Sequence, residues 1–374
     1  MTYRGQILVC VSFMVLFGIM IVFTSSAVMA GDRFGSIYFF AKKQAIAAGM
    51  GLVLIGLIQL VPFKLIERCN LLVLLLSLIL LILVLIPGFG VKINGAYRWL
   101  RVFGVMNLQP SEVAKVSILL FLAKNMSRNT YDVKNFYLGV VPNVLVSLLL
   151  AGLIICQPDL GSAFMIVSVT FVLLYVSGIP KWQVFSSIGL GLGALAVAVI
   201  AAPYRMKRLT SFLRPWEEYS QGGFQIIQSW MAFKNGGLWG LGLGESRQKL
   251  FFLPEAHSDF IFPVIAEELG FFGVLFVILA FCYLCLLGFR VASLHKNNNY
   301  YRYLAFGITV LIAIQALINI AVSTGTMPTK GISLPFISSG GSSLLIFMVL
   351  AGILMKLASL KIRDTKKTTH SIFT

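Results

Sequence analysis

Residues 260–289 read FIFPVIAEELGFFGVLFVILAFCYLCLLGF, an apolar run in which Glu267 and Glu268 are the only charged residues. A helix that crosses the hydrocarbon core of a bilayer needs about 20 apolar residues, and this run is longer. The rest of the chain has the same character, because 58% of its 374 residues are hydrophobic and 11% are charged. A soluble core needs far less apolar surface. We therefore expect an integral membrane protein.

Further apolar runs predict an all-α polytopic membrane protein with ten transmembrane helices, so that both termini lie on one side of the membrane. The cations divide almost equally between the two sides. Short loops and the basic tail at residues 359–374 weigh most in topology, which favours cytoplasmic termini. The predicted helices lie near residues 7–29, 44–62, 71–88, 108–124, 137–156, 160–179, 182–202, 260–289, 303–325 and 336–358.

The longest connection, residues 203–259, joins predicted helices 7 and 8 and should form one large extracytoplasmic loop. It is too short and too rich in glycine to fold as a separate domain, so residues 1–374 are predicted to form a single membrane domain. The run GGLWGLGLG at residues 236–244 would allow the backbone to pack closely against a ligand or a helix, because glycine lacks a Cβ atom.

Charged residues inside predicted spans are costly and usually functional. Glu112 and Lys115 stand three residues apart on one helix face, so they can pair as a structural ion pair or bind a substrate phosphate. Of Glu267 and Glu268, at least one must face protein or water. The Gly- and Ser-rich loop at residues 324–343 needs protein or a water-filled cavity beside its irregular backbone.

The stretch LPEAHSDF at residues 253–260 sets two carboxylates and a histidine at the mouth of the apolar run. Asp259 lies where the loop meets the helix, which suits either a proton acceptor or a helix cap. Glu255 is its neighbour, so which carboxylate accepts a proton stays open. The cations expected outside the membrane suit a phosphate-bearing ligand or anionic lipid headgroups.

Six segments along nearly the whole chain resemble the SEDS (shape, elongation, division, sporulation) family. Two of its usual features differ here: Ser339 replaces a common tyrosine, and serines at 162 and 258 replace frequent threonines. The segments are NGAYRW at residues 94–99, QPSEVAK at 109–115, QPDLGS at 157–162, QIIQS at 225–229, PEAHSDF at 254–260 and PTKGISLPFISSGGSS at 328–343.

The resemblance implies a ten-helix peptidoglycan glycosyltransferase that polymerises lipid II into β-1,4 glycan strands with inversion. PTKG at residues 328–331 looks like the division branch, which serves septal cell wall synthesis, rather than the elongation branch. A sporulation relative is a further alternative. The expected location is the bacterial inner membrane at the division septum, with both termini cytoplasmic.

By similarity, Asp259 corresponds to the catalytic acid of the family and would act as general base. Arginine and lysine groups would stabilise the polyprenyl pyrophosphate leaving group. A divalent cation (Mg²⁺ or Mn²⁺) could share that work with Asp159 or Glu255 as ligand, although the sequence contains no dedicated metal motif. The expected substrate-binding residues are Lys43, Arg98, Trp99, Glu112, Lys115, Asp159, Arg205, Arg208, Gln228, Ser229, Glu255, His257, Lys330, Ser338, Gly340, Gly341 and Ser342.

The partners that the resemblance implies are lipid II and the nascent glycan strand on undecaprenyl pyrophosphate, an FtsI-like class B penicillin-binding protein, and division proteins of the FtsQ, FtsL and FtsB type. No nucleic acid is expected. Two other classes of function compete. A flippase for the same lipid would also need broken helices and half-buried charges, and a scaffold for division partners would leave Asp259 without a purpose. An elongation-type polymerase is a variant of the enzyme reading.

Overall fold

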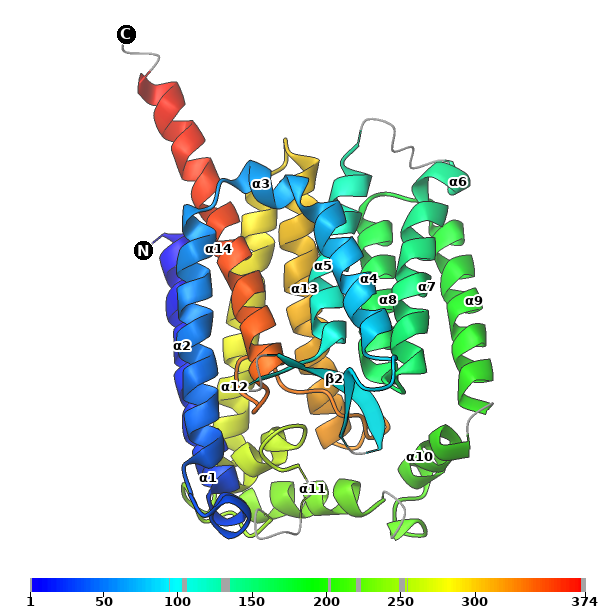
Figure 1. Cartoon of the computed structure of the whole chain (residues 1–374). Helices are drawn as coiled ribbons and strands as arrows, with labels where there is room; N and C mark the ends of the chain where they lie inside the picture. Colours follow the sequence, from blue (N-terminus) through cyan, green and yellow to red (C-terminus); the bar gives the residue numbers. More distant parts are fainter. Residues whose placement is uncertain are drawn as a thin grey trace.

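Helices build almost all of this protein, and ten of those in the described part of the chain coincide with the ten predicted spans (Figure 1). The computed structural model describes residues 2–93, 95–102, 106–128, 135–200, 203–219, 223–248, 253 and 255–370. Among these residues, five helices are long and apolar enough to cross a membrane. The chain is a multi-pass membrane protein. The ten helices are α1 (Tyr3–Phe34), α2 (Phe39–Leu60), α4 (Asn70–Leu83), α5 (Pro110–Met126), α7 (Val141–Cys156), α8 (Leu160–Val176), α9 (Lys181–Ile200), α12 (Ile261–Leu294), α13 (Asn299–Ser323) and α14 (Gly341–His370).

The first and last helices show that the two ends of the chain share one side, as an even number of spans requires: α1 begins and α14 ends at the same end of the bundle (Figure 1). Helix α14 extends through much of the predicted tail. The opposite end carries a small sheet with α10 and α11, and we call it the hairpin end (Figure 1). The short helices are α3 (Phe63–Arg68), α6 (Phe136–Gly139), α10 (Pro203–Leu213) and α11 (Gly223–Gly236).

Among the five long apolar helices, α13 and α14 are the most buried. In the most apolar 18-residue segment of each helix, 67% of α13 and 72% of α14 are buried inside the protein, against 28% of α2. Helix α5 packs against α4, α8 and α13. Polar side chains on α5 and α13 therefore face protein and not lipid: Glu112, Lys115, Gln315 and Asn319 are all buried.

A three-stranded antiparallel sheet at the hairpin end was not predicted. It consists of β1 (Gly90–Ile93), β2 (Ala96–Val102) and β3 (Met106–Leu108), in the order β1-β2-β3. The sequence does hold a hairpin signal, because Asn-Gly at positions 94–95 favours a tight turn. These strands are short and lie beside strongly apolar spans, so helical hydropathy alone does not reveal them.

The last predicted span, at residues 336–358, starts too early, because α14 begins at Gly341. Phe336 has a φ of 65°, which no helix accommodates. The Ser339 N–H donates to the carbonyl oxygen of His257 at 3.0 Å, far along the chain. Residues 324–340 therefore run as irregular backbone between α13 and α14, as the Gly- and Ser-rich composition of this loop predicts.

Helix α12 is broken at Gly270, where φ is 66° and ψ is −161°. The glycine-rich run fills the break: Leu241 N–H donates to the Glu267 carbonyl at 2.9 Å, and Phe271 N–H donates to the Gly237 carbonyl at 2.9 Å. A Cβ atom on Gly240 would clash with the Glu268 carbonyl group. The run therefore packs against a helix, one of the two roles expected for it.

Both Glu267 and Glu268 are fully buried in protein, which confirms that these carboxylates avoid lipid. Glu267 accepts hydrogen bonds from Asn235, from the Ser246 hydroxyl and from the Gln248 N–H. Thr24 on α1 donates to Glu268 at 2.8 Å. Glu267 thereby fastens the connection between α11 and α12 to the helix that follows it.

Substitution of Gly240 by alanine should lower the free energy of unfolding by about 2–3 kcal/mol, because the residue combines a positive φ of 80° with a backbone clash. Titration with denaturing detergent measures the change. Gly152→Ala is the matched control, since a Cβ there meets nothing within 4 Å and alanine suits a helix better than glycine. Equal stability of Gly240→Ala and wild type would contradict this account of the break.

Candidate active site

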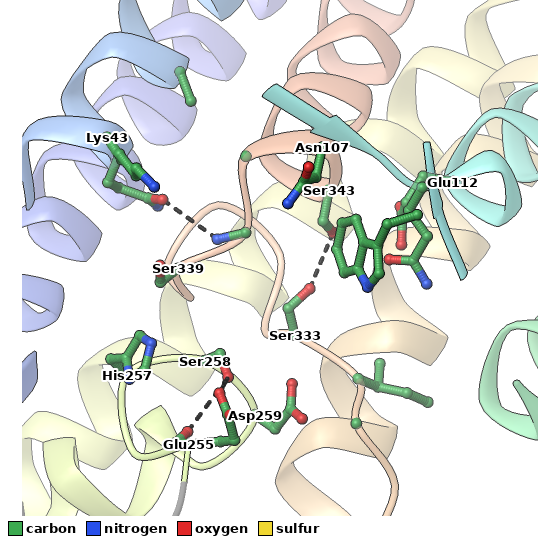
Figure 2. A pocket seen from close by; sticks show the side chains of 18 of the residues that line it. Lys43, Asn107, Glu112, Glu255, His257, Ser258, Asp259, Ser333, Ser339 and Ser343 are labelled. Carbon is green, nitrogen blue, oxygen red and sulfur yellow. Dashed lines mark hydrogen bonds between the residues drawn. The ribbon is translucent and has the colours of Figure 1, made fainter. Parts of the chain in front are cut away.

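A cavity of about 650 Å³ is lined in part by β2, the middle strand of the sheet at the hairpin end. Its volume lies in the range of sites that hold small ligands. The walls come from α2, the sheet, α5, α8, α13, the loop before α12, and the loop before α14 with the start of that helix. Figure 2 shows many of the lining side chains. Many of the residues that the sequence pointed to line the cavity: Lys43, Arg98, Trp99, Glu112, Lys115, Glu255, His257, Asp259, Gly340 and Gly341.

The remaining predicted residues do not line this cavity. Gln228 and Ser229 are buried on α11, and Lys330 lies 5.2 Å from the ring of Phe164. Ser338 accepts a hydrogen bond from the Leu334 N–H at 2.8 Å, which shapes the loop. Asp159 and Ser342 lie just behind the wall, as described below. Arg205 and Arg208 belong to α10, and their side chains lie outside the described part of the structure.

One side of the cavity is acidic, with Glu255, Ser258 and Asp259 close together (Figure 2). Glu255 has a φ of 55°, so the chain turns sharply here. Its carbonyl oxygen accepts the N–H of Ser258 at 3.0 Å, and the Ser258 hydroxyl donates to its carboxylate at 3.0 Å. Helix α12 begins at Ile261 with Phe260 as the residue before it. Asp259 therefore precedes the helix and presents its carboxylate at the cavity wall.

His257 belongs to the same wall, with its ring centroid 4.3 Å from that of Phe40. Burial lowers the pKa of the imidazole below its ordinary value of 6.5; the Glu255 carboxylate opposes this shift, and Arg33 adds to it. The ring is therefore neutral at neutral pH. A neutral imidazole can accept a proton or donate one hydrogen bond, so His257 is a second candidate for proton transfer in the cavity.

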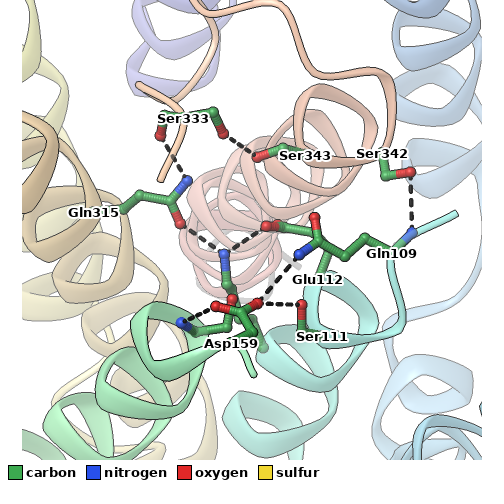
Figure 3. A network of polar contacts seen from close by, with 10 residues as sticks. Gln109, Ser111, Glu112, Asp159, Gln315, Ser333, Ser342 and Ser343 are labelled. Atoms are coloured by element: carbon green, nitrogen blue, oxygen red, sulfur yellow. Dashed lines mark hydrogen bonds and ion pairs between the residues drawn. The ribbon is translucent and has the colours of Figure 1, made fainter. Parts of the chain in front are cut away.

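The opposite, inner side holds a chain of polar contacts (Figure 3). Lys115 donates to Glu112 at 2.7 Å and to Gln315 at 2.8 Å. Gln315 in turn donates to the carbonyl oxygen of Ser333 at 3.0 Å. The predicted pair of Glu112 and Lys115 therefore forms. The second carboxylate oxygen of Glu112 is buried and has no partner among the described residues, so it can accept a hydrogen bond from a ligand.

Arg98 and Asp159 both fasten the corner between α7 and α8. The Arg98 guanidinium donates to the carbonyl oxygens of Gln157 at 3.0 Å and Pro158 at 2.6 Å. Asp159 caps α8 by accepting the Ser162 N–H at 3.1 Å, and it also accepts from Gln109 at 3.2 Å (Figure 3). Arg98 thus binds backbone while it lines the cavity, and Asp159 has a structural task.

Lys43 differs from the other cations of the cavity. Its ammonium lies 4.2 Å from the ring centroid of Phe39 and forms no ion pair within the described ranges. The start of α14, at Gly341, borders the same cavity, and backbone N–H groups at a helix N-terminus favour an anion. Over the residues that the structure describes, no three His, Cys, Asp or Glu side chains gather to hold a metal ion, so a bound divalent cation stays a hypothesis.

Sequence reasoning missed several residues of the site, chiefly carboxamides and serines. Gln44, Asn107, Gln109, Gln315, Ser333 and Ser343 all line the cavity. Ser342 behind it donates to the Asn107 carbonyl at 2.5 Å and so ties β3 to α14. A uniform search for amides within apolar spans would have found Gln44, Gln315 and Asn319, because a polar amide in a membrane helix needs a protein partner.

Comparison with known proteins gives consistent matches over nearly the whole chain. The model of the family FTSW_RODA_SPOVE, described as "Cell cycle protein", matches residues 4–362. The probable peptidoglycan glycosyltransferase FtsW of Trichlorobacter lovleyi is 42% identical over 370 residues, covering 97% of each chain. Stage V sporulation protein E of Bacillus subtilis is 41% identical over 359 residues, covering 96% of this chain and 97% of the relative.

A solved structure described as "Structural coordination of polymerization and crosslinking by a peptidoglycan synthase complex" has a similar fold. Its TM-score is 0.77 at 30% identity, with 96% of this chain and 98% of the other covered. The fold, the segments quoted from the sequence and these matches agree. The chain belongs to the FtsW/RodA/SpoVE family of cell cycle proteins, the SEDS family that its sequence resembles.

Proposed function

We propose that this protein is a peptidoglycan glycosyltransferase that polymerises lipid II into β-1,4 glycan strands for the septal cell wall. The observation that carries the proposal is the position of Asp259 on the wall of a cavity that also holds cations, at one end of a membrane bundle. A sugar anchored in the bilayer by a lipid can arrive at such a site. The names of the relatives, probable peptidoglycan glycosyltransferases among them, support this reaction.

The reaction needs a proton acceptor. The 4-hydroxyl of the acceptor's N-acetylglucosamine attacks the anomeric carbon of the growing chain, and the bond to the polyprenyl pyrophosphate breaks with inversion. As the new C–O bond forms, the hydroxyl proton must leave to a base within hydrogen-bond reach. Asp259 fills this role in our proposal, since its carboxylate borders the cavity and is not the cap of α12. Glu255 and His257 are its alternatives on the same wall.

The reaction also needs positive charge where the pyrophosphate departs. Lys43 and the start of α14, at Gly341, suit this task best, because they line the cavity and Lys43 has no carboxylate partner among the described residues. Lys115 is neutralised by Glu112. The guanidinium of Arg98 is directed to backbone carbonyls, so its charge adds to the local field while its hydrogen bonds hold the fold.

In the proposed orientation the hairpin end faces outward and both termini are cytoplasmic. Lipid II and the glycan strand would then meet the cavity on the outer side of the inner membrane. A class B penicillin-binding protein is the proposed partner, supported by the similar fold of a chain from a structure described as a peptidoglycan synthase complex. The septal location and the division proteins as partners are proposed only because PTKG at residues 328–331 resembles the division branch of the family.

Asp259→Asn should abolish glycan synthesis, with a loss of at least about a hundredfold in rate, because the amide keeps the shape of the side chain and cannot accept a proton. The measurement is polymerisation of labelled lipid II by purified protein with its partner transpeptidase. Glu217→Gln is the matched control, as it removes a carboxylate from the same long connection at an exposed position. Normal polymer from Asp259→Asn would refute its role as base. Lipid movement in liposomes without any polymer would favour the flippase.

Lys43→Met should lower kcat/KM for lipid II by about a hundredfold, because a charge next to the departing pyrophosphate is lost. Lys42→Met provides the comparison, since this neighbouring lysine is exposed and does not line the cavity. Both variants lose one positive charge from the same turn of α2. If the two lose activity equally, Lys43 acts through the general surface charge and does not contact the leaving group.

His257 should make the protein less stable in acid. The unfolded chain binds a proton on this imidazole near pH 6.5, whereas the folded chain binds it only at lower pH. Below about pH 6.5 the unfolded state therefore holds more protons, and the free energy of unfolding falls as the pH falls. The Tm of wild type should drop more between pH 7 and pH 5 than the Tm of His257→Gln. Parallel slopes for the two proteins would contradict the lowered pKa.

A further inference from the structure

Helix α13 places two carboxamide side chains, Gln315 and Asn319, one helical turn apart on the same face. Both are almost completely inaccessible, with exposed fractions of 0% and 1%. Residues four apart on a helix lie next to each other. This face of α13 meets the two loops that form the cavity wall, the one that ends at Asp259 and the one that contains residues 331–333.

Asn319 connects these two loops through a single nitrogen atom. Its Nδ2 donates to the carbonyl oxygen of Asp259 at 2.9 Å and to the carbonyl oxygen of Ile332 at 2.7 Å. Both partners are acceptors, so the orientation of the amide is fixed by chemistry. Only a carboxamide offers two N–H groups on one atom without a charge. Leucine, of nearly the same size, would leave both carbonyl groups without this donor.

The amide oxygen of Asn319 carries an energetic penalty for this connection. Its Oδ1 is buried and has no hydrogen-bond partner within the described part of the chain. A buried acceptor without a partner is unfavourable, and an apolar side chain would avoid it. The chain tolerates the unpaired oxygen, which indicates that the two donated bonds serve a purpose that packing alone would not supply.

The two hydrogen bonds of Asn319 fix a contact between Gly331 and the Asp259 carboxylate. A Cβ atom at this residue would lie 2.8 Å from Oδ2 of Asp259, so the carboxylate rests directly against the Gly331 backbone. Asn319 holds the residue that follows Gly331 and also the backbone of Asp259 itself. One amide therefore fixes both sides of this contact.

Gln315 extends the same arrangement to the inner side of the cavity. It donates to the Ser333 carbonyl at 3.0 Å and accepts from Lys115 at 2.8 Å. The segment 331–333 is thus fastened to α13 at two successive carbonyl groups (Figure 3 shows the Gln315 half). Hydrogen bonds from α13 therefore hold both the Asp259 backbone and the Glu112–Lys115 pair in place.

We propose that Asn319 is a positioning residue for Asp259: by clamping the Asp259 and Ile332 carbonyl groups together, it sets the place of the carboxylate in the cavity. The proposal rests on the glycosyltransferase function for its kinetic consequence, but the clamp itself can be measured without catalysis. Asn319 touches no reacting group. Its removal should change the rate of the chemical step and leave the binding of substrate nearly unchanged.

Asn319→Leu should lower kcat of lipid II polymerisation, measured with the partner transpeptidase, by about a hundredfold, with KM within about threefold of wild type. Asn143→Leu is the matched control. Asn143 is also a buried asparagine in a membrane helix that donates to a backbone carbonyl, at 2.7 Å, but it lies away from the cavity. Both variants are expected to lower Tm by similar amounts, and only Asn319→Leu to lower kcat. Equal kcat values for the two variants would show that Asn319 is merely structural.

Gly331→Ala tests the same contact from the other side, because its methyl group pushes on the Asp259 carboxylate directly. If both changes act through the place of this carboxylate, the double variant should be no slower than the slower single variant. Multiplication of the two effects would overturn the proposal. Should Asn319→Leu not fold, Asn319→Asp keeps the shape and, once protonated, donates to one carbonyl only; it should show a smaller loss of kcat with the same KM.

Hydrogen exchange gives a readout that is independent of activity. In Asn319→Leu, amides of residues 255–260 and 331–334 should exchange faster together, by about tenfold or more, while other segments keep the wild-type rates. Unchanged exchange in both segments would refute the clamp whatever the activity. If Asn319→Leu exchanges faster in these segments but the wild-type protein makes no polymer, the proposed glycosyltransferase function is refuted and the clamp is supported.

Discussion

The backbone of residues 332–338 must be hydrogen-bonded inside the protein, where most of it is buried, and the rest of the site depends on how this is done. Hydrocarbon offers no partners, so an irregular segment at this depth must find them in protein. Carboxamides on the helices supply them. Gln44 donates to the Ser338 carbonyl at 3.0 Å, Gln315 to that of Ser333 and Asn319 to that of Ile332. The shape of the cavity wall is therefore set by α2 and α13.

The cations of the cavity differ in whether their hydrogen bonds are already used within the protein. Arg98 donates to two backbone carbonyl groups, and Lys115 is held between Glu112 and Gln315. Lys43 contacts an aromatic ring, which keeps its charge available. Residue type cannot distinguish these cases, because an arginine donates to carbonyl oxygen and to phosphate with the same geometry. Contacts decide which cation is free.

Features with a local signal could be predicted from the sequence. The spans follow from apolar runs, the Glu112–Lys115 pair follows from its spacing on a helix, and Asp259 stands at a visible boundary between loop and apolar run. The short sheet, the cap at Asp159 and the clamp at Asn319 could not be placed in this way. Asn319 joins residues 259 and 332, and Gln44 reaches Ser338. Such partners are distant in sequence, so their meeting is a property of the packed bundle.

The break in α12 adds a second support for Asp259, from the long connection at residues 203–259. A continuous helix would have satisfied the Glu267 and Glu268 carbonyl groups internally; the turn at Gly270 frees them for the N–H groups of Leu241 and Gly242. The short segment of α12 that follows Asp259 is thereby joined to the glycine-rich run, and the Glu267 side chain fastens it to Ser246 and Gln248. Asp259 is thus fixed from the core by α13 and from the surface by the long connection. A carboxylate that borders a cavity needs both supports, because the open space beside it holds nothing in place.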